Sequence, residues 1–154
     1  MIYIGLGANL PSKYGTPVLT LEAAIQKLLE FGVKAVLLSK WYNTKPVPVS
    51  KQPNYINGVA LVETNLDPEK LLGCLHETEN YFGRKRQKLN EARPLDLDLL
   101  DYNRIIQLGP PNLPHPRMHN RAFVLNPLQE IAPNWVHPKT GKSIDFLLSR
   151  LQDL

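Results

Sequence analysis

Two helix starts of the same kind constrain the fold of this chain more than any other feature. They are Thr16-Pro17 and Asp67-Pro68, and each lies between runs of apolar residues. A threonine or aspartate side chain can accept a hydrogen bond from a free N–H group in the first turn of a helix. Proline is favoured at the first helical position because the N–H that it lacks would have no partner there. The pattern predicts two helices, which end at the glycines at positions 32 and 83.

The apolar runs around these helices predict strands, because they are rich in β-branched residues or alternate with polar ones. We place the strands at residues 2–6, 33–38, 55–63 and 95–102. The resulting order, strand-helix-strand-strand-helix-strand, is typical of an α+β ferredoxin-like sandwich, with helices packed on one face of an antiparallel sheet. Later in the chain we expect two shorter helices, at residues 119–128 and 143–151. Two proline-rich loops are expected at residues 44–54 and 110–116.

Length and composition narrow the class of protein. With 154 residues and no linker, the chain is expected to form a single domain, residues 1–154. A net charge of +4 leaves two interpretations open: an ordinary basic surface, or an anionic partner such as a nucleotide or a nucleic acid. The one cysteine, Cys74, allows no internal disulfide, which fits the cytoplasm. No apolar run approaches the ~20 residues that would span a membrane.

The strongest local signal is a pair of aspartates in the last predicted strand, Asp96 and Asp98, which alternate with Leu95, Leu97 and Leu99. Residues two apart on a strand point to the same face, so the carboxylates would lie side by side, about 7 Å apart at Cα. Two ionised carboxylates repel each other unless a cation lies between them, and Mg²⁺ prefers such oxygens together with phosphates and water. A solvated strand face with two acids is the other interpretation.

Basic residues stand directly before the acidic pair, at Arg84, Lys85, Arg86, Lys88 and Arg93. Acidic and basic side chains at one edge are typical of a metal–polyphosphate site, in which guanidinium groups neutralise the phosphate oxygens that the metal does not hold. A solvated loop and an RNA-binding loop remain open as alternatives.

Other signatures of nucleotide or metal binding are missing from the sequence. There is no Walker A motif, and Gly5-Leu6-Gly7 is interpreted as a tight turn after the first strand. The histidines do not have the spacing of a zinc site. His115, close to Arg117 and Arg121, is able to donate a hydrogen bond to a phosphate.

Several motifs taken together resemble the 6-hydroxymethyl-7,8-dihydropterin pyrophosphokinase family over nearly the whole chain. The motifs are the opening at 4–10, the Gln-Pro-Asn-Tyr-Ile-Asn stretch at 52–57, Glu79 with the arginines at 84 and 86, Arg93 with Asp96 and Asp98, and the stretch from 114 to 123. The resemblance implies the ferredoxin-like fold. It also implies an ATP-dependent diphosphotransferase of folate biosynthesis, which moves pyrophosphate from ATP to the pterin hydroxymethyl group and leaves AMP.

The resemblance also implies roles for individual residues. Metal ligands are Asp96 and Asp98, which would hold two Mg²⁺ ions on the ATP phosphates, and the catalytic set is Arg84, Arg93, Asp96 and Asp98. ATP would be bound by Glu79, Arg84, Arg86, Arg93, Leu99, His115 and Arg121. The pterin would be bound by Thr44, Lys45, Val47, Tyr55, Asn57, Asp96 and Phe123.

The physical chemistry agrees with the pterin assignments. Two aromatic faces, Tyr55 and Phe123, hold a flat ring well, and the Asn57 amide offers the acceptor and donors that match a lactam edge. Each of these residues alone would be interpreted as part of a core or a strand. The loop at 84–93 lacks the tryptophan and glycine that many members carry, since Asn90-Glu91-Ala92 stands there.

We expect a monomer that binds small molecules, with neither a nucleic-acid nor a membrane partner. The alternative functions are a non-catalytic ferredoxin-like module that binds a ligand, and one that binds RNA.

Overall fold

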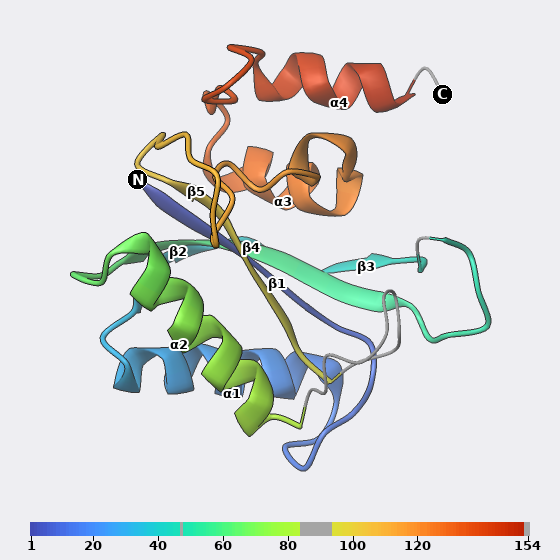
Figure 1. The fold of residues 1–154 in the computed structure, drawn as a ribbon. Coiled ribbons are helices and arrows are strands. Elements are labelled where there is room, and N and C mark those ends of the chain that lie inside the picture. Colours follow the sequence, from blue (N-terminus) through green and yellow to red (C-terminus); the bar gives the residue numbers. More distant parts are fainter. Residues whose placement is uncertain (47, 84–93, 153–154) are drawn as a thin grey trace.

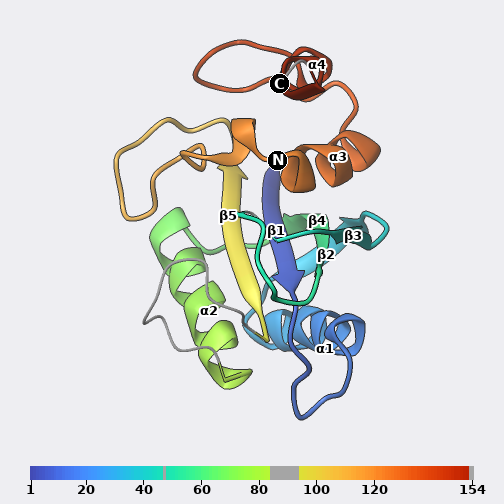
Figure 2. The same cartoon turned by 90° about the vertical axis from the view of Figure 1, so that its right-hand side faces the viewer.

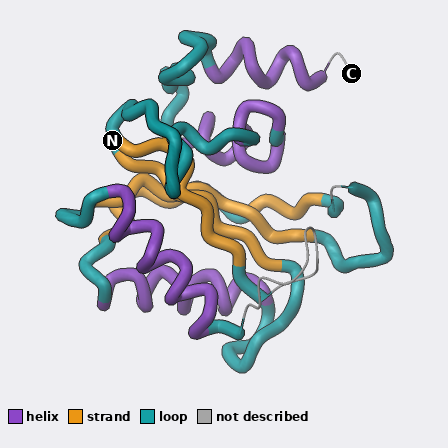
Figure 3. Tube along the Cα trace, viewed as in Figure 1, coloured by secondary structure: helices purple, strands orange, loops and turns teal. Residues whose placement is uncertain are grey.

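The structure is a computed structural model, and it describes residues 1–46, 48–83 and 94–152. Its centre is an antiparallel sheet in which β1 (Ile2–Ala8) lies between β4 (Tyr55–Glu63) and β5 (Asp96–Tyr102). The outer strand β2 (Lys34–Leu38) and the short strand β3 (Tyr42–Thr44) both pair with β4. The order β2-β4-β1-β5 confirms the predicted α+β ferredoxin-like sandwich. Figure 3 shows the strands together in one layer with helices packed beside it.

The two predicted capping residues begin the two long helices. α1 (Pro17–Glu30) starts with the Leu19 N–H donating to Thr16 Oγ1 at 3.4 Å. α2 (Pro68–Tyr81) starts with the Lys70 N–H donating to Asp67 Oδ1 at 2.8 Å. Both helices cover the same face of the sheet (Figure 1), where their leucines pack on apolar side chains of β1, β4 and β5.

The opposite face carries the later helices. The 3₁₀ turn η1 (Met118–Asn120) leads into α3 (Ala122–Ile131), and α4 (Ile144–Gln152) packs outside α3. Figure 2 shows α3 and α4 across the sheet from α1 and α2. The expectation of helices on one face was therefore incomplete, because Tyr3, Val59 and Leu100 make one end of this second face apolar too. No helix in the described residues is long and apolar enough to span a membrane.

Three local predictions were wrong. Gly5 and Gly7 lie inside β1, which continues to Ala8, and do not form a turn. Thr44 is the last residue of β3 and does not open a loop. The helix predicted over 119–128 begins later, at Ala122, after the separate turn η1.

Candidate active site

The acidic pair lies on the face of β5 that α1 and α2 do not cover. Leu95, Leu97 and Leu99 are buried in the core under those helices, whereas Asp96 and Asp98 are only half-buried. Side chains alternate along a strand, so the two carboxylates point together to the opposite face. The sequence prediction that they share a face is confirmed.

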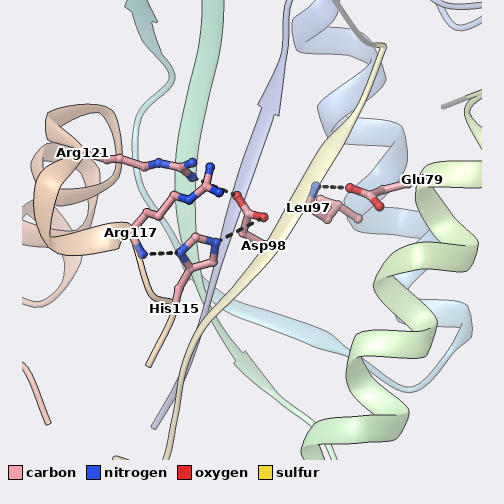
Figure 4. Close-up of polar contacts among 6 residues, drawn as sticks. All are labelled: Glu79, Leu97, Asp98, His115, Arg117 and Arg121. Atoms are coloured by element: carbon pink, nitrogen blue, oxygen red, sulfur yellow. Dashed lines mark hydrogen bonds and ion pairs between the residues drawn. The ribbon is translucent and has the colours of Figure 1, made fainter. Parts of the chain in front are cut away.

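Two further groups meet Asp98 on this face. Arg121, the residue before α3, places Nη1 3.9 Å from Asp98 Oδ2, and His115 places Nε2 3.8 Å from Asp98 Oδ1. Figure 4 shows both side chains on the same side of β5 as Asp98. A partly exposed ion pair at this distance contributes only about 0–1 kcal/mol to stability. The fold therefore gains little stability from this grouping.

His115 is held as a neutral donor. The Arg117 N–H donates to His115 Nδ1 at 3.1 Å, so a neutral ring carries its proton on Nε2, the nitrogen that faces Asp98. The pKa of His115 is lowered to about 4, mainly because the ring is buried and also because Arg121 and Arg117 are positively charged, while Asp96 opposes the shift. Near neutral pH the ring therefore offers an N–H to an anion without adding a charge.

A polar amide lies across β1 from the acids. Asn57 in β4 is 7% exposed, and its Nδ2 donates to Thr44 Oγ1 in β3 at 2.7 Å. In the strand register, Gly7 pairs with Asn57 on one side and with Asp96 on the other. Paired residues share a face, so the amide and the carboxylate flank a position without a side chain, with their backbones about 10 Å apart.

The aromatic pair belongs to the same face. Tyr55 lies two residues before Asn57 in β4, which places its side chain on the same side of the sheet. Its hydroxyl donates to Gln52 Oε1 at 3.5 Å. Phe123, in the first turn of α3, packs on the second core, and the Arg121 guanidinium carbon lies 5.5 Å from the centre of its ring. Both rings are half-buried, so each keeps an accessible part.

A depression of about 250 Å³ opens beside Asp98 at the outer edge of β5. Leu72 and His76 of α2 form one wall, and Asn112 and His115 belong to the other. The Leu97 N–H points to this outer edge, since it donates to Glu79. Leu99, two residues further on, presents its backbone in the same direction.

Other predicted site residues lie elsewhere. Glu79 is fully buried on the α2 side, where Oε2 accepts the Leu97 N–H at 2.8 Å, across β5 from Asp98 (Figure 4). Lys45 is exposed directly after β3. Four predicted residues lie outside the described residues: Val47, Arg84, Arg86 and Arg93. The contacts of Glu79 and of these residues with a substrate stay predictions.

Two features escaped the sequence analysis. One is the position of Gly7 between Asn57 and Asp96. The sequence did carry a signal for it, because Gly5 and Gly7 alternate with the apolar residues Leu6 and Ala8, as residues of a strand do. The other is Glu130 of α3, which accepts from the Tyr42 hydroxyl at 2.6 Å and so connects α3 to β3. Nothing local in the sequence pairs these two residues.

Comparison with known proteins gives one consistent family. The model of 7,8-dihydro-6-hydroxymethylpterin-pyrophosphokinase (HPPK) matches residues 3–133. The chain is 44% identical over 140 residues to the 2-amino-4-hydroxy-6-hydroxymethyldihydropteridine pyrophosphokinase of Haemophilus influenzae. The aligned region covers 90% of this chain and 85% of that protein. It is 40% identical over 151 residues to the protein of the same name from Synechocystis. This alignment covers 96% of this chain and 74% of that protein.

A longer relative matches as well. The chain is 38% identical over 153 residues to the folic acid synthesis protein fol1 of Pneumocystis carinii, covering 99% of this chain and 20% of that protein. Family match, relatives and fold agree with one another: the chain belongs to the 7,8-dihydro-6-hydroxymethylpterin-pyrophosphokinase family.

Proposed function

We propose that this protein transfers the β,γ-pyrophosphate of ATP to the hydroxymethyl oxygen of 6-hydroxymethyl-7,8-dihydropterin, giving AMP and the pterin diphosphate for folate biosynthesis. The family match and the names of the relatives support an ATP-dependent pyrophosphokinase over a non-catalytic binding module. The observation that carries the proposal is the meeting of Asp98 with Arg121 and His115 on an open sheet face. That grouping sets a carboxylate beside two donors for phosphate oxygens.

The acidic pair fits Mg²⁺. Asp96 and Asp98 present carboxylate oxygens on one partly exposed face, and Mg²⁺ usually takes one or two carboxylates together with substrate phosphates and waters. We assign both aspartates as ligands of two Mg²⁺ ions. When bound, the metal supplies charge neutralisation on the phosphate oxygens.

The chain's own residues position the reacting groups. Arg121 and the neutral His115 donate to phosphate oxygens, and the depression beside Leu99 and His115 receives the adenine base. Tyr55 and Phe123 hold the pterin ring, while Asn57 and the segment 44–47 hold its lactam edge. The hydroxymethyl oxygen then forms a bond to the β-phosphorus in line, while the bond from this phosphorus to the α,β-bridging oxygen breaks and AMP leaves. The hydroxyl proton is released, and no side chain needs to form a covalent bond.

Several wider properties belong to the same proposal. We infer a monomer with a single domain over residues 1–154, located in the cytoplasm, with small-molecule partners and without nucleic-acid binding. The basic net charge is then explained by anionic substrates.

The test is AMP formation from ATP, Mg²⁺ and the hydroxymethyl pterin. We expect the wild-type protein to turn over, with a loss of at least about 100-fold in Asp96→Asn and in Asp98→Asn, because a neutral amide holds Mg²⁺ weakly and the phosphate charge then stays uncompensated. Glu22→Gln, an exposed acid on α1, is the matched control and should keep full activity.

Three results would contradict the proposal. Near-normal turnover in either aspartate variant would remove the metal role. ATP or pterin binding without AMP release would favour a non-catalytic module. RNA binding that needs no Mg²⁺ and weakens steeply with salt would favour the RNA-binding alternative.

A further inference from the structure

Gly7 lies so close to the Asn57 amide, a proposed pterin-binding group, that no residue with a side chain would fit at position 7 without a shift. A Cβ atom at this position would stand 2.7 Å from Asn57 Oδ1 and 3.8 Å from Asn57 Cγ. Carbon and oxygen atoms without a bond do not approach to 2.7 Å, so one of the two groups would have to move. The Gly7 backbone is paired on both sides, with β4 and with β5, and so the Asn57 side chain is the part that would move.

The Asn57 amide has little freedom to move without loss. Its Nδ2 donates to Thr44 Oγ1 at 2.7 Å, and the residue is only 7% exposed. Rotation away from a Cβ at position 7 would break the contact with Thr44 and turn the oxygen out of its present direction. An amide reads a lactam edge only when its acceptor and its donors point the correct way.

We propose that Gly7 is a positioning residue for the pterin: the missing side chain lets the Asn57 amide keep its orientation. This inference rests on the proposed function, because it concerns the pterin side of that site. It assigns no contact with ATP to Gly7. The effect of a substitution should therefore fall on pterin binding alone.

Gly5 provides the matched control within the same strand. It lies two residues earlier on the same face, but a Cβ there would meet only Leu100 methyl carbons at 3.6 Å and Asp98 Cβ at 3.8 Å, which are ordinary contacts. The side chain of Leu100 already covers this position. Gly5→Ala thus introduces the same methyl group into β1 without reaching Asn57.

The experiment compares Gly7→Ala with Gly5→Ala and wild type. We expect Gly7→Ala to raise the KM for the pterin at least about tenfold while the KM for ATP stays within about twofold, and Gly5→Ala to match wild type in both. The dissociation constant of 6-hydroxymethylpterin, measured with Mg²⁺ and a non-hydrolysable ATP analogue, should change in parallel. Equal pterin affinity in Gly7→Ala and Gly5→Ala would overturn the inference.

A double substitution tests whether Gly7 acts through Asn57. In an Asn57→Ala background there is no amide to displace, so Gly7→Ala should weaken pterin binding no further. A further loss as large as that in the wild-type background would overturn the inference.

A measurement without ligand separates this inference from the proposed function. The side-chain NH₂ signals of Asn57 in ¹⁵N spectra of the free protein should shift in Gly7→Ala and stay in place in Gly5→Ala. Unchanged signals in both variants would overturn the role of Gly7 while wild-type AMP formation still supported the function. Absence of AMP formation by wild type would overturn the function itself.

Discussion

At the scale of single residues, the protonation state of His115 decides what it offers to a phosphate. Burial is the largest cause that lowers its pKa to about 4, and Arg121 and Arg117 act in the same direction. We therefore expect NMR titration of the free protein to give a midpoint well below the usual 6.5, with the proton of the neutral ring on Nε2. In Arg121→Gln the midpoint should rise, because one neighbouring positive charge is gone. A wild-type midpoint at or above 6.5 would contradict this.

The same histidine makes folding stability depend on pH. Its pKa is depressed in the folded state, so between 6.5 and 4 the unfolded chain binds a proton that the folded chain does not. Stability is then complete above about pH 6.5 and falls as the pH falls, by roughly 1–2 kcal/mol for this group between pH 6.5 and about pH 5. Urea unfolding across this range measures the slope. His115→Asn is the control and should show a smaller slope, with the remainder due in part to the buried His137, whose pKa is also lowered.

Local spacing predicted some site residues and not others. The period of two in β5 was enough to place Asp96 and Asp98 on one face, because alternation follows from strand geometry alone. The approach of His115 to Asp98 depends on a long-range contact, in which the His115 N–H donates to Leu100 O at 2.8 Å and holds the preceding loop along β5. No spacing within the sequence encodes that contact. The sequence alone indicated that His115 could donate to a phosphate, but only the family motifs placed His115 and Arg121 in one site with Asp98.

At the scale of elements, a single carboxylate connects α3 to the pterin side of the sheet. Glu130 accepts from the Tyr42 hydroxyl at 2.6 Å and from the Lys40 N–H at 3.0 and 3.2 Å. The hydrogen bond to Glu130 is the largest cause that raises the pKa of Tyr42 to about 12. Since β3 has only three residues, these bonds hold Thr44, its last residue, in register.

Removal of this carboxylate should loosen β3. We expect Glu130→Ala to lower the free energy of unfolding by roughly 1–3 kcal/mol and to speed amide hydrogen exchange in β3, because the Lys40 N–H and the Tyr42 hydroxyl lose their acceptor. Pterin affinity should fall as well, since Thr44 holds Asn57. Glu22→Ala, at an exposed position of α1, is the matched control. Exchange in β3 at the wild-type rate would show that Glu130 does not hold this strand.

The accuracy of the element predictions follows the strength of their local signals. α1 and α2 begin where a cap and a proline coincide, and both caps form in the structure. α3 begins after Arg121, whose side chain has no acceptor for a helical N–H, so no cap marked its start. Gly5 and Gly7 were interpreted as turn residues because glycine favours turns. Pairing of β1 on both sides keeps them extended.

At the scale of the whole molecule, the two faces of the sheet are covered to different extents. α1 and α2 close one face with a continuous core. On the other face, α3 covers the apolar cluster that contains Tyr3, Val59 and Leu100, and α4 packs outside α3. Asn57, Asp96 and Asp98 lie at the remaining end of this face. The uneven cover explains how so small a chain keeps both a core and an open polar surface on a single sheet. The second core also holds Arg121 and Phe123 in place, because both lie at the start of α3, which packs in that core.

α4 should therefore be part of the folded unit, although it follows the residues that the family model matches, 3–133. Leu147 is 3% exposed within the second core, whereas its neighbour Phe146 is 47% exposed. We expect Leu147→Ala to lower the free energy of unfolding by about 2–4 kcal/mol, because it leaves a cavity in the second core. Phe146→Ala should change it by less than about 1 kcal/mol. Equal losses in urea unfolding would mean that α4 does not share the core, and that residues 3–133 carry the stability alone.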